Sequence, residues 1–270
     1  MGYIIVIEGT DGSGKQTQSI KLYERLKADG YNVIRQSFPN YESNSSAPVK
    51  MYLGGELCAK ASDMDAYQTS ALFAVDRLCT YMKDLKAHYD AGGIIILDRY
   101  TQSNMLHQAG KIHDTTERDK FLDWLDRFEF EELKLPRADK VVFLDVPPEV
   151  SMRLASEREG LKAGTSKDIH EQDTNHIIDA YNSGKYVANK YDWTVISCVE
   201  NNNLKTIEKI HEEIYKNMLL EGNIKAEETL IIDDSDKNIE AARNLGISTL
   251  KVDNGEDWRN KLDRILLADK

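Results

Sequence analysis

The sequence predicts an α/β domain in which helices cover both faces of a five-stranded parallel sheet. Three observations support this fold class. Short apolar runs alternate with segments of helical periodicity, and the first run leads through a glycine-rich loop into a helical pattern. The length of 270 residues is ample for one such domain and a small appendage. A short strand–helix–strand pattern near the C-terminal end predicts that appendage.

Five apolar runs predict the strands of the sheet. They are Tyr3–Ile7, Asn32–Phe38, Ile94–Leu97, Lys140–Val146 and Thr194–Val199. Because helical patterns separate successive runs, the strands are expected to lie parallel to one another.

Three segments carry the helical periodicity most clearly. Gln16–Ala28 repeats apolar residues on one face, and Asp63–Asp90 predicts one long helix that ends before a glycine pair. Leu204–Leu220 predicts a terminal helix packed on the sheet. The α/β domain is therefore expected to span residues 1–220, and residues 221–270 need a separate explanation.

Composition and charge exclude several classes of protein. The net charge of −11 argues against a protein that coats nucleic acid or binds a membrane surface, because those concentrate Lys and Arg in a stripe. No run is long enough to span a membrane, and Met1 leads directly into a strand, so a cytoplasmic location is expected. The spacing of the three cysteines and six histidines predicts neither a disulfide framework nor a zinc site.

A phosphate-binding loop is predicted between the first strand and the first helix. The segment consists of Gly9, Thr10, Asp11, Gly12, Ser13, Gly14, Lys15, Gln16 and Thr17. Its glycines let backbone N–H groups converge on phosphate oxygens, the helix N-terminus adds partial positive charge, and Lys15 reaches the terminal phosphates. The segment is therefore predicted to bind ATP; the alternative is a glycine-rich turn without a ligand.

Two residues of this loop are unusual. Gln16 replaces the hydroxyl residue that usually contacts Mg²⁺. Its amide oxygen can be a ligand, Thr17 can take the role, or waters and an acidic residue elsewhere can hold the metal. Asp11 is either a turn-former or an acceptor for a sugar hydroxyl of a second substrate, and the second interpretation favours a kinase.

Two motifs in the expected order resemble the thymidylate kinases, which phosphorylate dTMP with ATP. They are Glu8–Lys15 and Leu97-Asp98-Arg99-Tyr100. The resemblance covers roughly residues 1–220 and implies a P-loop kinase fold, Mg²⁺ bound with ATP, small nucleotides as partners and a homodimer. The predicted helix Asp63–Asp90 offers an apolar face for the second copy.

The resemblance also implies which residues bind the acceptor nucleotide. A Phe-Pro corner lines the monophosphate pocket, and Tyr41 stands where an arginine often follows it. Phe73 stacks on the thymine ring, although spacing alone favours a core position, and a Gln amide suits the edge of a pyrimidine. The alternative for the stretch that contains this Gln is a solvated helix face. The predicted substrate-binding residues are Asp11, Phe38, Pro39, Tyr41, Phe73, Arg77, Arg99, Ser103 and Gln108.

Asp98 and Arg99 end the third strand, where ligands bind in open parallel sheets. Asp98 is predicted to hold Mg²⁺ directly or through water, together with Gln16. Arg99 is predicted to clamp the acceptor phosphate, whose oxygens match its planar fork. The alternative is a surface ion pair.

A basic segment follows the fourth strand and predicts a lid that supplies charge to the transition state. Its cations are Arg153, Arg158, Lys162 and Lys167, and the segment Asp168–Gln172 matches the far border of the family's lid. Some thymidylate kinases carry the assisting arginine in the loop and others in the lid. Because Gly12 stands where the loop arginine would be, Arg158 is predicted to be catalytic, with Lys15, Asp98 and Arg99. Arg153 and Lys162 are alternatives, as is a solvated charged face.

The C-terminal segment Thr229–Ile247, followed by the predicted strand Ser248–Val252, is similar to the last motif of haloacid dehalogenase-like phosphatases. In that family a pair such as Asp233 and Asp234 helps to hold Mg²⁺. The chain contains no nucleophile motif of that family, so an independent phosphatase is not expected. The segment is expected to dock on the first domain, to pair with another chain, or to be a fused fragment.

The sequence therefore predicts phosphoryl transfer from ATP to dTMP, with charge stabilisation and no covalent enzyme intermediate. One alternative is a kinase for another deoxynucleoside monophosphate. A second is a nucleotide-binding regulatory module in which Gln16 and Tyr41 mark weakened catalysis.

Overall fold

The computed structural model describes residues 2–159, 174–200, 203–220, 230–244, 248–253, 259 and 262. The chain divides into two compact units, residues 1–215 and 216–270. The first unit contains the five-stranded sheet and a short hairpin, and the second contains a two-stranded sheet.

The five predicted strands form one parallel sheet in the order β2-β3-β1-β4-β5. Their bounds are β1 (Tyr3–Glu8), β2 (Val33–Ser37), β3 (Ile94–Asp98), β4 (Lys140–Asp145) and β5 (Thr194–Ser197). The predicted α/β class and the parallel sheet are confirmed. Because all strands run the same way, their carboxyl ends meet at one edge, where the candidate site lies.

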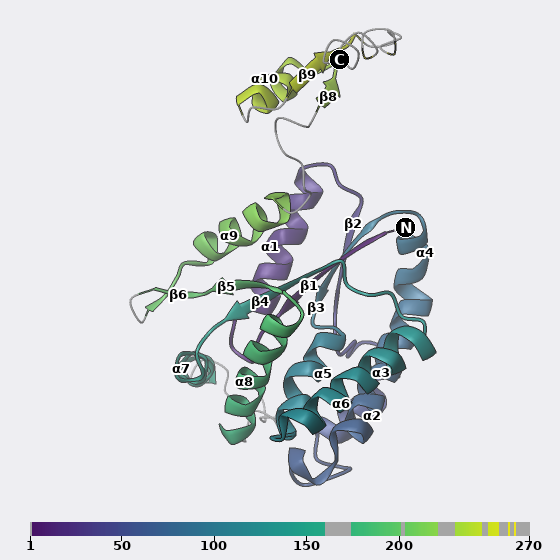
Figure 1. The fold of residues 1–270 in the computed structure, drawn as a ribbon, viewed down its shortest axis with the longest axis vertical. Coiled ribbons are helices and arrows are strands. Elements are labelled where there is room, and N and C mark those ends of the chain that lie inside the picture. Colours follow the sequence, from purple (N-terminus) through teal and green to yellow (C-terminus); the bar gives the residue numbers. More distant parts are fainter. Residues whose placement is uncertain are drawn as a thin grey trace. The chain divides into compact units, whose positions relative to one another are not determined.

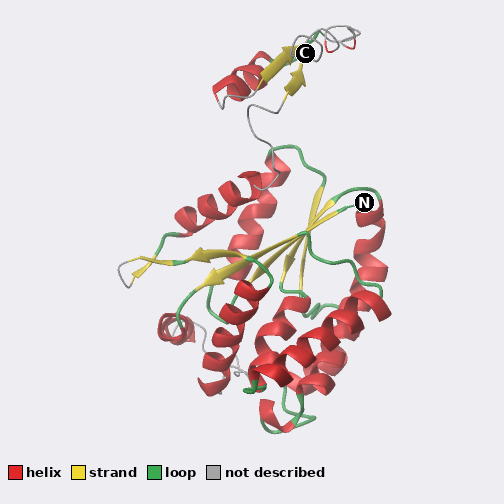
Figure 2. Ribbon diagram, in the orientation of Figure 1, coloured by secondary structure: helices red, strands yellow, loops and turns green. Residues whose placement is uncertain are grey.

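Helices lie on both faces of this sheet (Figures 1 and 2). Those in the first part of the chain are α1 (Lys15–Ala28), α2 (Ala47–Leu53), α3 (Ala66–Thr80), α4 (Lys86–Asp90) and α5 (Thr101–His107). They are followed by α6 (Thr115–Asp126), α7 (Pro148–Glu159), α8 (Thr174–Lys190) and α9 (Ile207–Leu220). The hairpin is formed by β6 (Val199–Glu200) and β7 (Asn203–Leu204).

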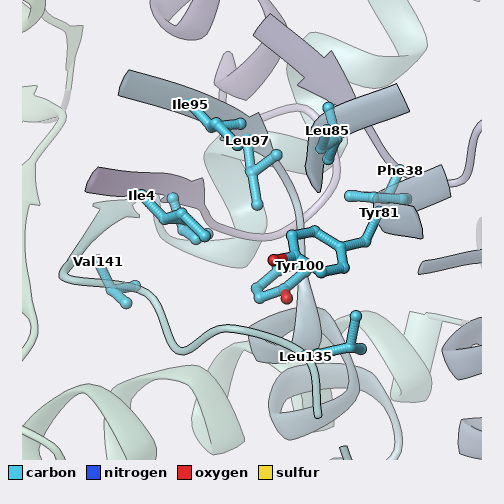
Figure 3. Packing of buried hydrophobic residues seen from close by; sticks show 10 residues of the cluster. Ile4, Phe38, Tyr81, Leu85, Ile95, Leu97, Tyr100, Leu135 and Val141 are labelled. Atoms are coloured by element: carbon cyan, nitrogen blue, oxygen red, sulfur yellow. The ribbon is translucent and has the colours of Figure 1, made fainter. Parts of the chain in front are cut away.

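Alternating side chains of the central strands fill the core on both faces of the sheet. Ile4 of β1 belongs to a buried cluster that includes Ile95 and Leu97 of β3, together with Tyr81 and Tyr100 (Figure 3). The intervening residues of β1 point to the opposite face and are also buried. Full burial of each such side chain stabilises the fold by roughly 1.5–3 kcal/mol. The candidate site therefore lies at the edge of a well-packed sheet.

The expectation of one continuous helix over Asp63–Asp90 is wrong in detail. Helix α3 begins after Asp65, whose carboxylate accepts a hydrogen bond from the backbone N–H of Gln68, at 2.7 Å. After α3 the chain forms a π-helical turn before α4 begins. Tyr81 and Leu85, the two ends of this turn, both belong to the buried cluster.

The predicted terminal helix Leu204–Leu220 also begins later than expected. Leu204 lies in β7, where it pairs with Val199, and α9 starts at Ile207. Leu204 is therefore part of the hairpin, and the apolar repeat of the helix begins at Ile207.

The second unit has the predicted strand–helix–strand order. It consists of β8 (Leu230–Asp233), α10 (Asp236–Asn244) and β9 (Ser248–Lys251), and the two strands pair in parallel. Ile239 and Ala242 of α10 are its buried apolar residues among those described. Across the described segments of both units, no helix is both long and apolar enough to cross a membrane.

Candidate active site

The loop between β1 and α1 has the conformation that its glycines permit. Gly14 caps α1 at φ 89°, and Gly12 has φ 81°, both in the left-handed region that favours glycine. A Cβ atom on Gly12 would also lie 2.9 Å from the carbonyl oxygen of Ser151 in α7. The loop hydroxyls of Thr10 and Ser13 are buried and make no hydrogen bond within the described structure. Such groups are suited to receive an anion.

Lys15 lies at the start of α1 and is 6% exposed. Its Nζ donates a hydrogen bond to the carbonyl oxygen of Thr10, at 2.7 Å, and lies 3.9 Å from a carboxylate oxygen of Asp11. Burial, assisted by the nearby Arg99, lowers the pKa of Lys15 to about 8. The ammonium group is therefore held inside the loop, where phosphate oxygens would replace a backbone carbonyl as its partner.

Arg99 follows β3 with a left-handed φ of 70° and joins the loop to α5. Its guanidinium donates hydrogen bonds to Asp11 and to the hydroxyl of Ser103, the latter at 3.4 Å. It also lies 3.3 Å from Nε2 of His107 and 3.8 Å from the carboxylate of Glu8. Arg99 is thus a cation held between two carboxylates at the mouth of the loop.

Glu8 is fully buried at the end of β1. It accepts hydrogen bonds from the hydroxyl of Ser103, at 2.7 Å, and from the backbone N–H of Gly9, at 2.9 Å. Burial raises the pKa of the Glu8 carboxyl, and Arg99 and Lys15 oppose that shift. Sequence analysis assigned no role to Glu8, although its position inside the first quoted motif was a signal.

A cavity opens beside the loop and encloses about 580 Å³ of empty space, part of it open to solvent. All nine predicted substrate-binding residues line this cavity. They are Asp11, Phe38, Pro39, Tyr41, Phe73, Arg77, Arg99, Ser103 and Gln108. Their individual roles remain predictions, but the residues come together from four separate segments of the sequence.

Phe73 and Arg77 project from one face of α3, as their spacing of four residues predicts. Phe73 is half-buried and also packs edge-on against Tyr52, with ring centroids 6.2 Å apart. Arg77 is 2% exposed, and Glu129 accepts two of its hydrogen bonds, at 2.7 and 2.5 Å. Sequence analysis missed Glu129, which is 52 residues away along the chain.

The Phe38–Pro39 corner follows β2, and its peptide bond is cis. Asp76 of α3 accepts hydrogen bonds from the backbone N–H of Asn40, at 2.7 Å, and from the hydroxyl of Ser45, at 2.6 Å. Asp76 therefore anchors the corner to α3. Asp76 lies next to the predicted Arg77, but its partners Asn40 and Ser45 are more than 30 residues away along the chain and were not predicted.

Gln108 is 1% exposed and lines the cavity just beyond α5. Its Oε1 is buried and accepts no hydrogen bond from the described residues. An amide oxygen in this position costs free energy unless a ligand or water donates to it. Asn104 and His107 of the same stretch also line the cavity, and of these two His107 was not predicted.

The two predicted metal ligands lie in different surroundings. Asp98 is 5% exposed, and the guanidinium of Arg35 donates to its Oδ2 at 3.0 Å. Gln16 is exposed in the first turn of α1. No cluster of three or more His, Cys, Asp or Glu side chains in the described ranges is arranged to hold a metal ion.

The predicted lid is described in part. Arg153 is exposed on α7, and Arg158 belongs to the same helix, but the side chain of Arg158 lies outside the described structure. Lys162, Lys167 and the segment Asp168–Gln172 also lie outside the described residues. The role of these cations stays a prediction.

In the second unit, the carboxylate of Asp233 accepts hydrogen bonds from the backbone N–H of Ser235, at 2.7 Å, and from the amide of Asn238, at 3.1 Å. These bonds tie the end of β8 to the start of α10. Asp234 is exposed. The apolar residues Leu245, Ile247 and Trp258 of this unit lie outside the described residues.

Two family models match the chain. The model described as thymidylate kinase matches residues 7–214, and the model described as haloacid dehalogenase-like hydrolase matches residues 190–252. Both resemblances expected from the sequence are therefore confirmed. The first match includes the loop, the residues that line the cavity, strands β2 to β5 in full and the last two residues of β1.

Individual relatives agree with the first model. The chain is 34% identical to the thymidylate kinase of Mycobacterium tuberculosis strain H37Rv over 63% of its own length and 78% of that protein. It is 29% identical to a probable thymidylate kinase of Methanococcus aeolicus, over 81% of its length and 97% of that protein. It is 28% identical to the thymidylate kinase of Plasmodium falciparum, over 80% of its length and 89% of that protein.

Proposed function

The chain belongs to the thymidylate kinase family, and we propose that it transfers the γ-phosphoryl group of ATP to dTMP, which yields ADP and dTDP. One observation carries this proposal most strongly: the predicted substrate residues line one cavity, and Asp11 and Arg99 join that cavity to the phosphate loop. A donor and an acceptor phosphate would meet at this junction.

The proposed reaction needs no protein nucleophile. A phosphate oxygen of dTMP attacks the γ-phosphorus of ATP in line, and ADP leaves with the electron pair of the bond that breaks. Lys15 and Arg99 neutralise charge on the transferring group, because phosphoryl transfer depends mainly on positioning and charge stabilisation. Arg158 is proposed as a further cation from α7.

The base of dTMP is proposed to lie between Phe73 and the far wall of the cavity. Gln108 supports this placement, since its buried Oε1 lacks a donor among the described residues, and the N3–H of thymine is such a donor. The Phe38–Pro39 corner and Tyr41 would enclose the monophosphate end. Another deoxynucleoside monophosphate remains the alternative acceptor.

ATP is proposed to bring Mg²⁺, which neutralises charge on the phosphates when bound. The described residues do not fit a metal site made by the protein, because Asp98 is paired with Arg35 and Gln16 is exposed. Mg²⁺ characteristically keeps several waters and is bound largely by substrate phosphates. The phosphates therefore are proposed to be its main ligands.

A homodimer in the cytoplasm is proposed as the working state. An exposed apolar stripe on α3 and the following turn supports the dimer. Val75 and Met82 are 47% and 58% exposed, and Cys79 between them is exposed as well. These residues recur at i, i+4 and i+7, so they lie on one helix face that a second copy could cover.

Residues 1–220 are proposed to form the kinase domain, and residues 221–270 a fused fragment of the haloacid dehalogenase type that is not required for turnover. The position of the first family match, residues 7–214, supports this division. A chain that ends after Leu220 should retain dTMP phosphorylation within about threefold of the full chain, a change that corresponds to less than about 1 kcal/mol. Loss of turnover by a folded truncated chain would contradict it.

The proposed activity is tested by ADP release with ATP, Mg²⁺ and dTMP, run beside dUMP, dCMP and dGMP at matched concentrations. Release selective for dTMP supports the proposal. Selectivity for another monophosphate would support the alternative acceptor, and ATP binding without any release would support the regulatory module.

A further inference from the structure

Arg35 makes an ion pair with Asp98, one of the two predicted metal ligands. Arg35 lies in β2, and its Nη2 donates a hydrogen bond to Oδ2 of Asp98 at 3.0 Å. The two side chains are 19% and 7% exposed. Sequence analysis did not single out Arg35, because a basic residue in an edge strand of the sheet is usually solvated.

A second hydrogen bond fixes the orientation of the guanidinium. Nε of Arg35 donates to the hydroxyl of Ser19 in α1 at 2.8 Å, and that hydroxyl in turn donates to the backbone carbonyl of Gln16 at 2.9 Å. The network therefore runs from the end of β3, through β2, to the first turn of α1. It ends at the residue that replaces the usual loop hydroxyl.

The sheet register explains how the pair forms. β2 and β3 are parallel neighbours, and Ser37 is paired with Asp98 in register. Arg35 lies two residues before Ser37, so both side chains project to the same face of β2. The long side chain of Arg35 thus reaches along the strand to the carboxylate at the end of β3.

The charges of the pair oppose direct metal ligation by Asp98. A divalent ion on this carboxylate would lie close to the guanidinium, and the resulting repulsion acts in a mostly buried, weakly screened site. Lys15 and Arg99 are two further cations nearby, because the charge of Asp98 acts to raise the pKa of each of them. The negative charge of Asp98 is therefore already balanced by protein groups.

We propose that Arg35 is a positioning residue that holds Asp98 as its counter-ion, so that Asp98 is not a direct ligand of the metal. This inference rests on the proposed function, because it takes from it that the metal binds together with ATP. The sequence-based expectation was that Asp98 holds Mg²⁺ directly or through water, and the proposal sets aside the direct form of it. Phosphate oxygens and water would then supply the metal's first coordination sphere.

The test measures Mn²⁺ binding to the full chain without nucleotide, from the loss of the free-ion signal in electron paramagnetic resonance. The proteins are wild type, Asp98→Asn, Arg35→Met and the double variant Arg35→Met/Asp98→Asn. Arg25→Met is the matched control, because Arg25 is a half-buried arginine of α1 that pairs with Glu212 and not with Asp98. Acidic residues elsewhere contribute equally to Mn²⁺ binding in every one of these proteins. The comparison therefore uses only the differences between their Mn²⁺ dissociation constants.

The proposal predicts that Asp98→Asn changes the Mn²⁺ dissociation constant by less than about twofold, because the carboxylate does not ligate the metal. Arg35→Met should bind Mn²⁺ at least about fivefold more tightly, since it frees a buried carboxylate, and the double variant should lose that gain. Arg25→Met should behave as wild type.

Two results would overturn the proposal. One is a dissociation constant about tenfold weaker in Asp98→Asn, which would make Asp98 a ligand despite Arg35. The other is no gain in a folded Arg35→Met protein. If Arg35→Met does not fold, the Asp98→Asn measurement decides alone. None of these results depends on turnover, so failure of the inference is distinguishable from failure of the proposed kinase activity.

Discussion

Arg77 and Glu129 form a buried ion pair that joins α3 to the π-helical turn after α6. Both side chains are at most 2% exposed, and two hydrogen bonds of 2.7 and 2.5 Å connect them. Thr101 and Asn104 of α5 donate to the same carboxylate. Two helices that line the cavity, α3 and α5, are thus tied to one buried carboxylate behind it.

Glu129→Ala should destabilise the protein by about 3–5 kcal/mol, because it leaves the guanidinium of Arg77 buried without a counter-ion. The measurement is the free energy of unfolding in urea. Glu132→Ala is the control: Glu132 lies in the same turn, is 59% exposed and pairs with Arg127, so its loss should cost less than about 1 kcal/mol. Equal costs for the two variants would contradict the buried-pair account.

ATP affinity should depend on pH through Lys15. Its pKa is lowered to about 8, so the side chain is cationic below this pH and loses its charge as the pH rises. Because phosphates bind the cation, the dissociation constant of ATP should increase by up to about tenfold per unit above pH 8. Calorimetric titrations from pH 7 to 9.5 measure this. Lys15→Met should bind weakly with a flat profile, and a flat profile in wild type would count against the role of Lys15.

Arg99→Ala should lower kcat by about 10³-fold, because a guanidinium that neutralises the transferring phosphoryl group contributes that much in related reactions. The dissociation constant of ATP should change far less, which equilibrium binding measures separately. Arg137→Ala is the control, since Arg137 pairs with Asp126 away from the cavity. Unchanged turnover in Arg99→Ala would remove Arg99 from the proposed mechanism.

Gln108→Leu should raise the KM for dTMP by about tenfold, the cost of one lost hydrogen bond between ligand and protein. The matched control is Gln102→Leu: Gln102 lies in α5, and its Oε1 is also buried without a partner in the described structure, but it does not line the cavity. Steady-state kinetics on both variants tests the assignment. A similar rise in KM in both would mean that Gln108 acts only through packing.

Substitution of the exposed stripe on α3 should separate the proposed dimer. Val75→Asp combined with Met82→Asp places charge in an apolar interface, so light scattering should give the monomer mass. Ile178→Asp, on α8 and 39% exposed in wild type, should leave the dimer intact. A monomeric wild type, or a dimeric double variant, would contradict the proposed interface.

Sequence reasoning predicted the parts of this protein that are local. The segment Gly9–Lys15 is a continuous motif, and its strand–loop–helix context is sufficient to place it. Asp98 and Arg99 follow an apolar run, and the carboxyl ends of parallel strands meet at one edge. These residues therefore were predicted together with the edge of the sheet at which they lie.

The long-range partners were not predictable in the same way. Glu129 stands 52 residues from Arg77, and Arg35 stands 63 residues from Asp98. Each pair forms only when distant elements pack, and a charged residue in a helix or edge strand is solvated in most proteins. The π-helical turn between α3 and α4 was not predicted either, because such a turn preserves the apolar pattern that predicts a helix.

The central claim is tested most directly by following the γ-phosphoryl group itself. The full chain is incubated with [γ-³²P]ATP, Mg²⁺ and dTMP, and the labelled products are separated by chromatography. The account predicts that the label moves to dTDP and that Arg99→Ala abolishes most of this transfer. Label that stays on ATP, or that appears as inorganic phosphate while dTMP remains unchanged, would contradict it.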